Sequence, residues 1–182
     1  MKHLIIKERE AQSFEKMKDA FHYKNFMAAP KVKKVVVNTG TGTAMKKDSK
    51  KNDAIAERLA KITGQKTALR GAKQSISSFK VRQGDPIGAL VTLRGKRMYA
   101  FLEKLINVAL PRTKDFRGIS RQAVDNVGNL TIGIKEHTIF PETADEDIKD
   151  IFGLSVTIVS SAKTKKEGLA FFENLGVPFK KE

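Results

Sequence analysis

The chain has 182 residues and 40% hydrophobic content, enough for one sizeable core or for two small ones, and its 35 basic and 20 acidic residues give a net charge of +15. That charge predicts a polyanionic partner, either a nucleic acid or an anionic membrane surface. The sequence has no run of about 18 apolar residues, no signal-peptide core and no cysteine, which excludes membrane spans and disulfides and leads us to expect a cytoplasmic protein.

Helical and strand patterns are mixed along the chain, without one strand for every helix. In the first part of the chain the sequence predicts a helix at 11–23, a strand at 32–39, and a helix between a cap at Asn52 or Asp53 and a stop at Gly64. A short strand at 66–69, a long mobile loop or ribbon at 70–88 and a strand at 89–93 are expected next. The rest of the chain is predicted to form a helix ended by Pro111, strands around 130–134 and 156–158, and a last helix that begins after Thr164.

The helices are predicted from apolar residues that recur at helical spacing. These residues are Phe14, Met17 and Phe21; Ile55, Leu59 and Ile62; Met98, Phe101, Leu102, Leu105 and Ile106; and Leu169, Phe172 and Leu175. The last helix also has a capping-box pair, Thr164 and Glu167, and a stop at Gly176 and Pro178.

The strands are predicted from short β-branched runs such as VKKVVVNT and from period-two alternation at Leu130, Ile132 and Ile134. No repeat, low-complexity tract or linker divides the chain. We therefore expect a single α+β domain over residues 1–182, with helices packed on one face of a largely antiparallel sheet. The other face of that sheet would be free to bind a partner.

The stretch from Lys61 to Lys104 carries ten basic and two acidic residues, a net charge of +8 in 44 residues. The basic residues are Lys61, Lys66, Arg70, Lys73, Lys80, Arg82, Arg94, Lys96, Arg97 and Lys104. They are interleaved with Gly, Gln, Ser and Thr, a mixture that suits phosphates and hydrogen-bonding edges. This concentration favours a nucleic-acid surface over a merely solvated basic face.

No enzyme or cofactor site emerges from the sequence. The turn Gly40-Thr41-Gly42 follows a strand, but Met45 stands where a dinucleotide loop needs its third glycine. His3, His22 and His137 have no ligand neighbours at metal spacing and are expected at a surface or interface. We therefore predict no catalytic residue, no cofactor and no metal.

An acidic segment from Glu136 to Asp150 contrasts with the basic chain. It carries six acidic residues against the single Lys149, a net charge of −5. Such a segment is most often solvated, and its alternative interpretation is a docking surface for a basic protein. A cationic chain with a compact acidic patch is expected in an assembly that holds both RNA and basic proteins.

Several strings, taken in order, resemble the bacterial ribosomal protein L-five family of the large subunit. They are AAPKVKKVVVNTGTG, ITGQK, SISSFKVRQGDPIGALVTLRG, LPRTKDFRGIS, GNLTIGIKEHTIFPE and AKTKKEGLAFFENLGVPF, and the match runs from about residue 25 to 179. The resemblance implies an RRM-like sheet that binds 5S ribosomal RNA in the central protuberance of the large subunit. It also implies 23S rRNA and other 5S-associated ribosomal proteins as partners.

The resemblance further assigns residues to three contacts. For 5S rRNA they are Asn38, Gln65, Lys66, Thr92 and Arg94. For the elbow of the P-site tRNA they are Lys73, Gln74, Ser75, Ser78, Lys80 and Arg82, in a basic loop at about 72–86. For the small-subunit head protein S-thirteen, in an intersubunit bridge, they are Glu142, Asp145, Glu146 and Asp147, in an acidic loop at about 138–150.

The predicted strands differ from those of sheets that bind single-stranded RNA. Sheets that stack single-stranded bases display aromatic residues, and the predicted strands VKKVVVNT and ALVTL have none. We therefore expect recognition of a folded RNA through shape, 2′-hydroxyls and phosphates. Two alternatives stay open at this point: an RNA chaperone that uses the same basic face, and a nucleotide-dependent enzyme built around TGTGTA.

Overall fold

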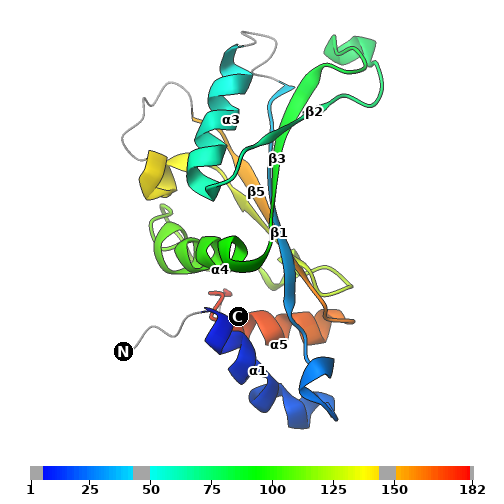
Figure 1. Cartoon of the computed structure of the whole chain (residues 1–182), viewed down its shortest axis with the longest axis vertical. Helices are drawn as coiled ribbons and strands as arrows, with labels where there is room; N and C mark the ends of the chain where they lie inside the picture. Colours follow the sequence, from blue (N-terminus) through cyan, green and yellow to red (C-terminus); the bar gives the residue numbers. More distant parts are fainter. Residues whose placement is uncertain (1–5, 43–49, 144–150, 181–182) are drawn as a thin grey trace. The chain divides into compact units, whose positions relative to one another are not determined.

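The computed structural model describes residues 6–42, 50–143 and 151–180, in which helices and strands alternate irregularly (Figure 1). The helices and strands, in order, are α1 (Ile6–Phe21), β1 (Val32–Gly40), α3 (Lys50–Thr63), β2 (Ala68–Gly71), β3 (Pro86–Leu93), α4 (Gly95–Lys104), β4 (Leu130–Ile134), β5 (Leu154–Ser160) and α5 (Lys165–Leu175).

The five strands form one antiparallel sheet in the order β2-β3-β1-β5-β4. At its edge, Ala68 pairs with Leu90 and Arg70 pairs with Gly88. The predicted α+β class and the largely antiparallel sheet are thereby confirmed.

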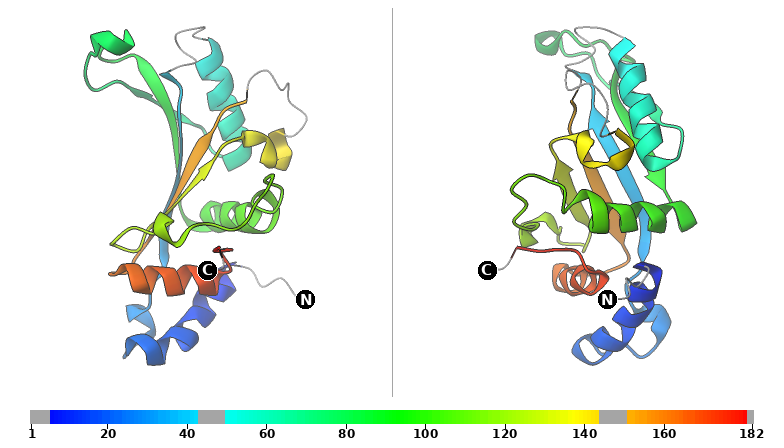
Figure 2. Two further views of the ribbon diagram at one scale, coloured as in Figure 1. Left: turned by 180° about the vertical axis from the view of Figure 1, so that it is seen from behind. Right: turned by 90° about the vertical axis from the view of Figure 1, so that its left-hand side faces the viewer.

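By packing, the chain divides into two compact units. The first unit comprises residues 1–35, 94–132 and 157–182, and the second comprises residues 36–93 and 133–156. In the first unit, α1 packs against α5, as Figure 2 shows, and also against α4. Its core includes Met17, Phe171 and Phe172, all almost inaccessible. Burial of each such side chain contributes about 1.5–3 kcal/mol relative to exposure.

Polar contacts also join the elements of the first unit. The Glu10 carboxylate on α1 accepts hydrogen bonds from the backbone N–H of Val32 (3.2 Å) and from the Tyr99 hydroxyl on α4 (3.2 Å). Burial raises the pKa of Glu10, against the opposing effect of these hydrogen bonds and of nearby lysines. The Tyr23 hydroxyl donates to Glu167 on α5.

In the second unit, α3 lies against β3 and covers one face of the strands (Figure 1). The helix buries its predicted apolar residues there, and β1 and β3 turn alternate residues towards that face. The buried residues are Ile55, Leu59 and Ile62 of α3, Val37 of β1, and Ala89, Val91 and Leu93 of β3. The short turn at 141–143 packs against α3, and the turn at 137–139 packs against the turn at 141–143.

Several local predictions are wrong. The first helix begins at Ile6 rather than at 11, and the strand predicted at 89–93 begins at Pro86. The second helix begins at Lys50 rather than after a cap at Asn52 or Asp53. Asn52 is instead buried, and its side-chain amide donates to the Pro86 carbonyl (2.9 Å), a tertiary contact that its position in the sequence does not reveal. The short edge strand is displaced by two residues, to 68–71, because pairing with β3 sets its limits.

The ends of α3 and α5 follow the predicted signals, whereas α4, predicted to run to Pro111, ends at Lys104 and continues as a π-helical turn at Leu105–Ala109. Gly64 (φ 66°) and Gly176 (φ 90°) adopt the left-handed conformation after α3 and α5. The Thr164 side chain accepts a hydrogen bond from the Glu167 N–H (3.3 Å), as the capping pattern predicts. One correction concerns α5, which buries Phe171 completely, whereas Leu169, predicted on its apolar face, is only half-buried.

Candidate nucleic-acid interface

The second unit leaves one face of its strands without a helix. The residues that alternate with the buried ones form this open face, namely Val36, Asn38, Gly40, Arg70, Gly88, Leu90, Thr92, Gly133 and Ser155. Asn38 is exposed on β1, and Thr92 is half-buried on the neighbouring strand β3. Two predicted RNA-facing residues therefore lie on the same face of adjacent strands.

Gln65 joins this pair through a direct contact. The left-handed turn at Gly64 ends α3, and the Gln65 side-chain amide then donates to the Thr92 carbonyl at the far end of β3 (3.2 Å). Thr63 helps to hold the turn, since its hydroxyl lies 2.8 Å from the Leu59 carbonyl and 3.3 Å from that of Gln65. The bond orients the Gln65 amide before any ligand arrives, so the oxygen of that amide is positioned as an acceptor.

Cations accompany these polar residues. Lys66 is exposed directly after Gln65. Arg94 is also exposed directly after β3, but it belongs to the first unit. Sequence analysis did not assign Arg70, which pairs with Gly88 and so lies on the open face. Only the register between β2 and β3 reveals this position.

All five strands lack aromatic residues. The absence of aromatic residues, predicted for two strands, therefore extends to every strand of the sheet. A surface of amides, hydroxyls, small residues and cations can contact riboses, phosphates and base edges, but it offers no ring on which bases could stack.

The basic loop after β2 is a hydrogen-bonded ribbon, one of the two forms that its sequence allows. Backbone hydrogen bonds pair Ala72 with Gly84 and Asp85, and Ile76 with Val81, at 2.8–3.3 Å. The Ser75 hydroxyl accepts the Gln83 N–H (2.9 Å), and the Asp85 carboxylate accepts the Arg82 N–H (2.7 Å). This hairpin exposes every residue assigned to it by resemblance, namely Lys73, Gln74, Ser75, Ser78, Lys80 and Arg82.

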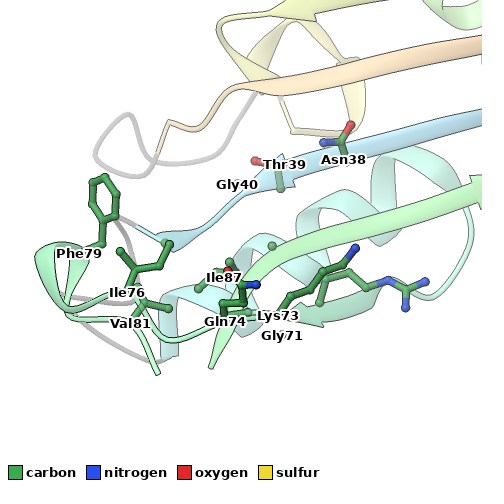
Figure 3. A pocket seen from close by; sticks show the side chains of 14 residues that line it. Asn38, Thr39, Gly40, Gly71, Lys73, Gln74, Ile76, Phe79, Val81 and Ile87 are labelled. Carbon is green, nitrogen blue, oxygen red and sulfur yellow. The ribbon is translucent and has the colours of Figure 1, made fainter. Parts of the chain in front are cut away.

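A hollow of about 970 Å³ lies between this hairpin and the end of β1. Figure 3 shows Asn38 and Thr39 on β1, and Ile76, Phe79 and Val81 on the hairpin, around it. The Phe79 side chain is 59% exposed at the hairpin tip, a feature that sequence analysis did not single out. Its only signal in the sequence is an aromatic residue within a strongly basic ribbon.

The predicted acidic contact is only partly described. Glu142 is exposed in the turn Pro141–Thr143, whereas Asp145, Glu146 and Asp147 lie outside the described residues. His137, expected at a surface or interface, is buried instead: its ring stacks on Phe152 with centroids 4.2 Å apart, and its Nδ1 accepts the Phe152 N–H (3.3 Å). That expectation is therefore wrong, because Phe152, two residues before β5, packs against the His137 ring.

The described residues contain no group of three or more His, Asp or Glu side chains that could hold a metal ion. Over the same part of the chain, no helix is long and apolar enough to cross a membrane.

Comparison with known proteins connects this geometry to a family. Residues 25–82 match the family model described as ribosomal protein L5, and residues 86–179 match the model that describes the C-terminus of the same ribosomal family. Relatives named large ribosomal subunit protein uL5 include that of Trichlorobacter lovleyi, 51% identical over 91% of this chain and 92% of the relative. The relative from Halothermothrix orenii is 46% identical over 97% of this chain and 98% of its own length.

Proposed function

The chain belongs to the ribosomal protein L5 family and is a structural, non-enzymatic constituent of the large ribosomal subunit, and on this premise we propose that the open face of its second unit binds 5S rRNA. The observation that carries the proposal is the polar group formed by Asn38, Gln65 and Thr92 on an uncovered sheet face. Lys66 and Arg94, exposed beside the strand ends in the sequence, supply phosphate contacts.

The mode of recognition follows from the chemistry of the face. Because Gln65 is already oriented by Thr92, its amide loses little conformational freedom on binding. The absence of aromatic residues from the strands favours a structured RNA over an unpaired strand. The open face therefore recognises the shape and the 2′-hydroxyls of a folded RNA, while Lys66 and Arg94 position the RNA through its phosphates.

The hairpin at 72–85 serves a second contact, with the elbow of the P-site tRNA. Its paired backbone makes it a stiff arm, and its exposed Lys73, Lys80 and Arg82 present charge to a phosphate backbone. Solvent-exposed charge contacts are individually weak, about 0–1 kcal/mol each. A tRNA held in this way is released readily.

The acidic segment serves a third contact, with the basic small-subunit head protein S-thirteen, in an intersubunit bridge. The support is its net charge of −5 over residues 136–150 and the exposure of Glu142. The 23S rRNA and other 5S-associated ribosomal proteins complete the proposed partners, without an assigned surface.

The test measures binding of the full chain to 5S rRNA and to a length-matched structured RNA across a salt series. A preference for 5S rRNA that persists at high salt is expected, because only the electrostatic part of the affinity falls with salt. Equal affinities that collapse together would contradict the proposal and favour a general RNA chaperone.

Two pairs of substitutions separate the face from the hairpin. Lys66→Gln with Arg94→Gln should weaken 5S binding and lower the salt slope by about 2, one for each lost phosphate contact. Lys73→Gln with Arg82→Gln removes the same charge from the hairpin and should leave 5S binding nearly unchanged. Equal losses from the two pairs would overturn this division of roles.

A further inference from the structure

In the second unit, the turn at 137–139 is tied to the chain just before β5 by His137. The two backbones bond reciprocally: the His137 N–H donates to the Phe152 carbonyl (3.1 Å), and the Phe152 N–H donates to Nδ1 of the imidazole (3.3 Å). The two rings also stack, with an angle of 10° between their planes and centroids 4.2 Å apart. We call this contact the His137–Phe152 link.

The residues on each side of the link are themselves held in place. The Thr143 hydroxyl donates to the His137 carbonyl (3.0 Å), which closes the turns at 137–139 and 141–143 on each other. The Gly153 carbonyl accepts the hydroxyl of Thr39 on β1 (2.6 Å). A Cβ at Gly153 would lie 3.1 Å from the Ile134 carbonyl oxygen, so this backbone also lies close to the end of β4. The link therefore joins two supported segments.

The imidazole can form this link only as a neutral ring. A ring nitrogen that accepts a hydrogen bond carries no proton, so the bond to Nδ1 puts the proton of the neutral ring on Nε2. His137 is 1% exposed, and burial disfavours the charged form of an imidazole. A proton on Nδ1 would turn the acceptor into a donor that faces the Phe152 N–H. The same ring therefore stabilises the link when neutral and opposes it when charged.

Among the described residues of the second unit, His137 is the only titratable residue that is buried. The charged side chains on the elements around the link are all exposed or half-buried. They are Lys135, Glu136 and Glu142 in and beside the two turns, and Lys51, Asp53, Glu57, Arg58 and Lys61 on α3, which packs against the turn at 141–143. Exposed charges act through water of high dielectric constant, so burial and the accepted hydrogen bond dominate the charge state of the ring.

We propose that the His137–Phe152 link is a pH-sensitive switch, closed while the imidazole is neutral and opened when the imidazole takes up a proton from water. Opening separates the turns that present Glu142 from the start of β5, because the charged ring is more stable in water than in the link. Glu142 belongs to the contact proposed for the small subunit, and in that respect the inference rests on the proposed function. Carboxylates ordinarily stay charged above about pH 5, so the switch would make this contact sensitive to pH in a range where carboxylates alone would not.

Hydrogen exchange of the Phe152 amide in the full chain tests the switch without any partner. An exposed histidine ordinarily has a pKa of about 6.5, so proton uptake should favour the open link about tenfold more at pH 5.5 than at pH 7.5. The protection factor of the Phe152 N–H, corrected for the intrinsic rate at each pH, should therefore fall about tenfold. The Thr41 N–H, which donates to the Ile87 carbonyl (2.8 Å) in the same unit, should change less than about twofold, since the opening is local.

His137→Gln is the matched variant, because its side-chain oxygen can accept the same N–H and does not titrate, so its Phe152 protection should stay within about twofold between pH 5.5 and 7.5. His22→Asn removes an exposed histidine of the first unit, at a φ of 54° that Asn tolerates, and should retain the tenfold fall. An equal fall in His137→Gln and in the wild type, or no fall in the wild type, would overturn the proposal. If His137→Gln does not fold, the wild type decides alone: equal falls at Phe152 and Thr41 would overturn the switch.

Binding of the small-subunit head protein S-thirteen, the proposed partner, measures the consequence of opening. Between pH 7.5 and 5.5 its affinity should fall severalfold more for the wild type than for His137→Gln. Equal pH dependence in the two proteins would overturn the regulatory role of the link. No binding by either protein at pH 7.5 would contradict the proposed contact, whereas the exchange of the Phe152 amide would still decide the switch.

Discussion

The chain contains two tyrosines, and each donates its hydroxyl hydrogen bond to a carboxylate of the first unit. Burial raises the pKa of Tyr99 from 10.0 to about 12, with a further contribution from the charge of Glu10. Burial and the bond to Glu167 raise the pKa of Tyr23 as well. Both phenols are thus expected to stay neutral at a pH where an unfolded chain ionises them.

This gives a prediction for the tyrosinate absorbance. Between pH 10 and 11 the native protein should show little tyrosinate absorbance, and unfolding in denaturant at the same pH should increase this absorbance. Because the pKa of Tyr99 is raised in the folded state, its neutral phenol contributes fully to the free energy of unfolding below pH 10. This contribution is lost as the pH rises towards about 12. Tyr99→Phe should remove part of the decline. Native titration near pH 10 would contradict the assignment.

At the scale of elements, α5 illustrates how a contact reverses a local preference. Ala normally stabilises a helix interior by about 1 kcal/mol relative to Gly. A Cβ at Gly168 of α5, however, would lie 2.6 Å from the Gly128 Cα and 2.9 Å from its carbonyl oxygen. That carbonyl also accepts the Ser160 hydroxyl (2.7 Å), so the loop at 128 cannot retreat without losing a buried bond.

We therefore expect Gly168→Ala to destabilise the protein by about 1–3 kcal/mol, the usual cost of overpacking, in spite of its better helix propensity. Denaturant unfolding measures the change. Gly133→Ala is the control, because an added Cβ there meets nothing within 4 Å and its effect should stay within about 0.5 kcal/mol of zero. A stabilised Gly168→Ala variant would show that the two backbones separate easily.

At the scale of the molecule, most of the net charge and the proposed specificity for 5S rRNA belong to different units. The first unit has 22 basic and 10 acidic residues and so carries +12 of the +15, and the second carries the polar open face. Binding that depends on charge should disappear with salt, and binding that depends on oriented polar groups should remain.

Hydrogen exchange can follow this separation. With an unrelated structured RNA at low salt, protection should concentrate in the first unit, which carries most of the net charge. With 5S rRNA at high salt, protection should remain on β1 and β3 of the second unit. Protection that falls in both units together as the salt concentration rises would contradict the division.

The sequence by itself determined the family, the α+β class and most helices and strands. The family follows from the resemblance of several strings, whereas the predicted helices and strands rest on local physics, since helical spacing, β-branched runs and capping residues act over a few positions. The capping contact between Thr164 and the Glu167 N–H, and the left-handed glycines 64 and 176, are as predicted for that reason. The resemblance likewise named residues 38 and 92, which the structure places on one face of adjacent strands.

Only the tertiary structure decided what depends on residues distant in the sequence. The cap at Asn52 and the exposure of His137 were predicted wrongly because Pro86 and Phe152, 34 and 15 residues away, bind them. Arg70 lies on the open face because β2 pairs with β3, and the Arg9 guanidinium donates a hydrogen bond to the Leu175 carbonyl, 166 residues away in the sequence. Local patterns carry no information about such partners, because the free energy of these contacts arises only when the chain has folded.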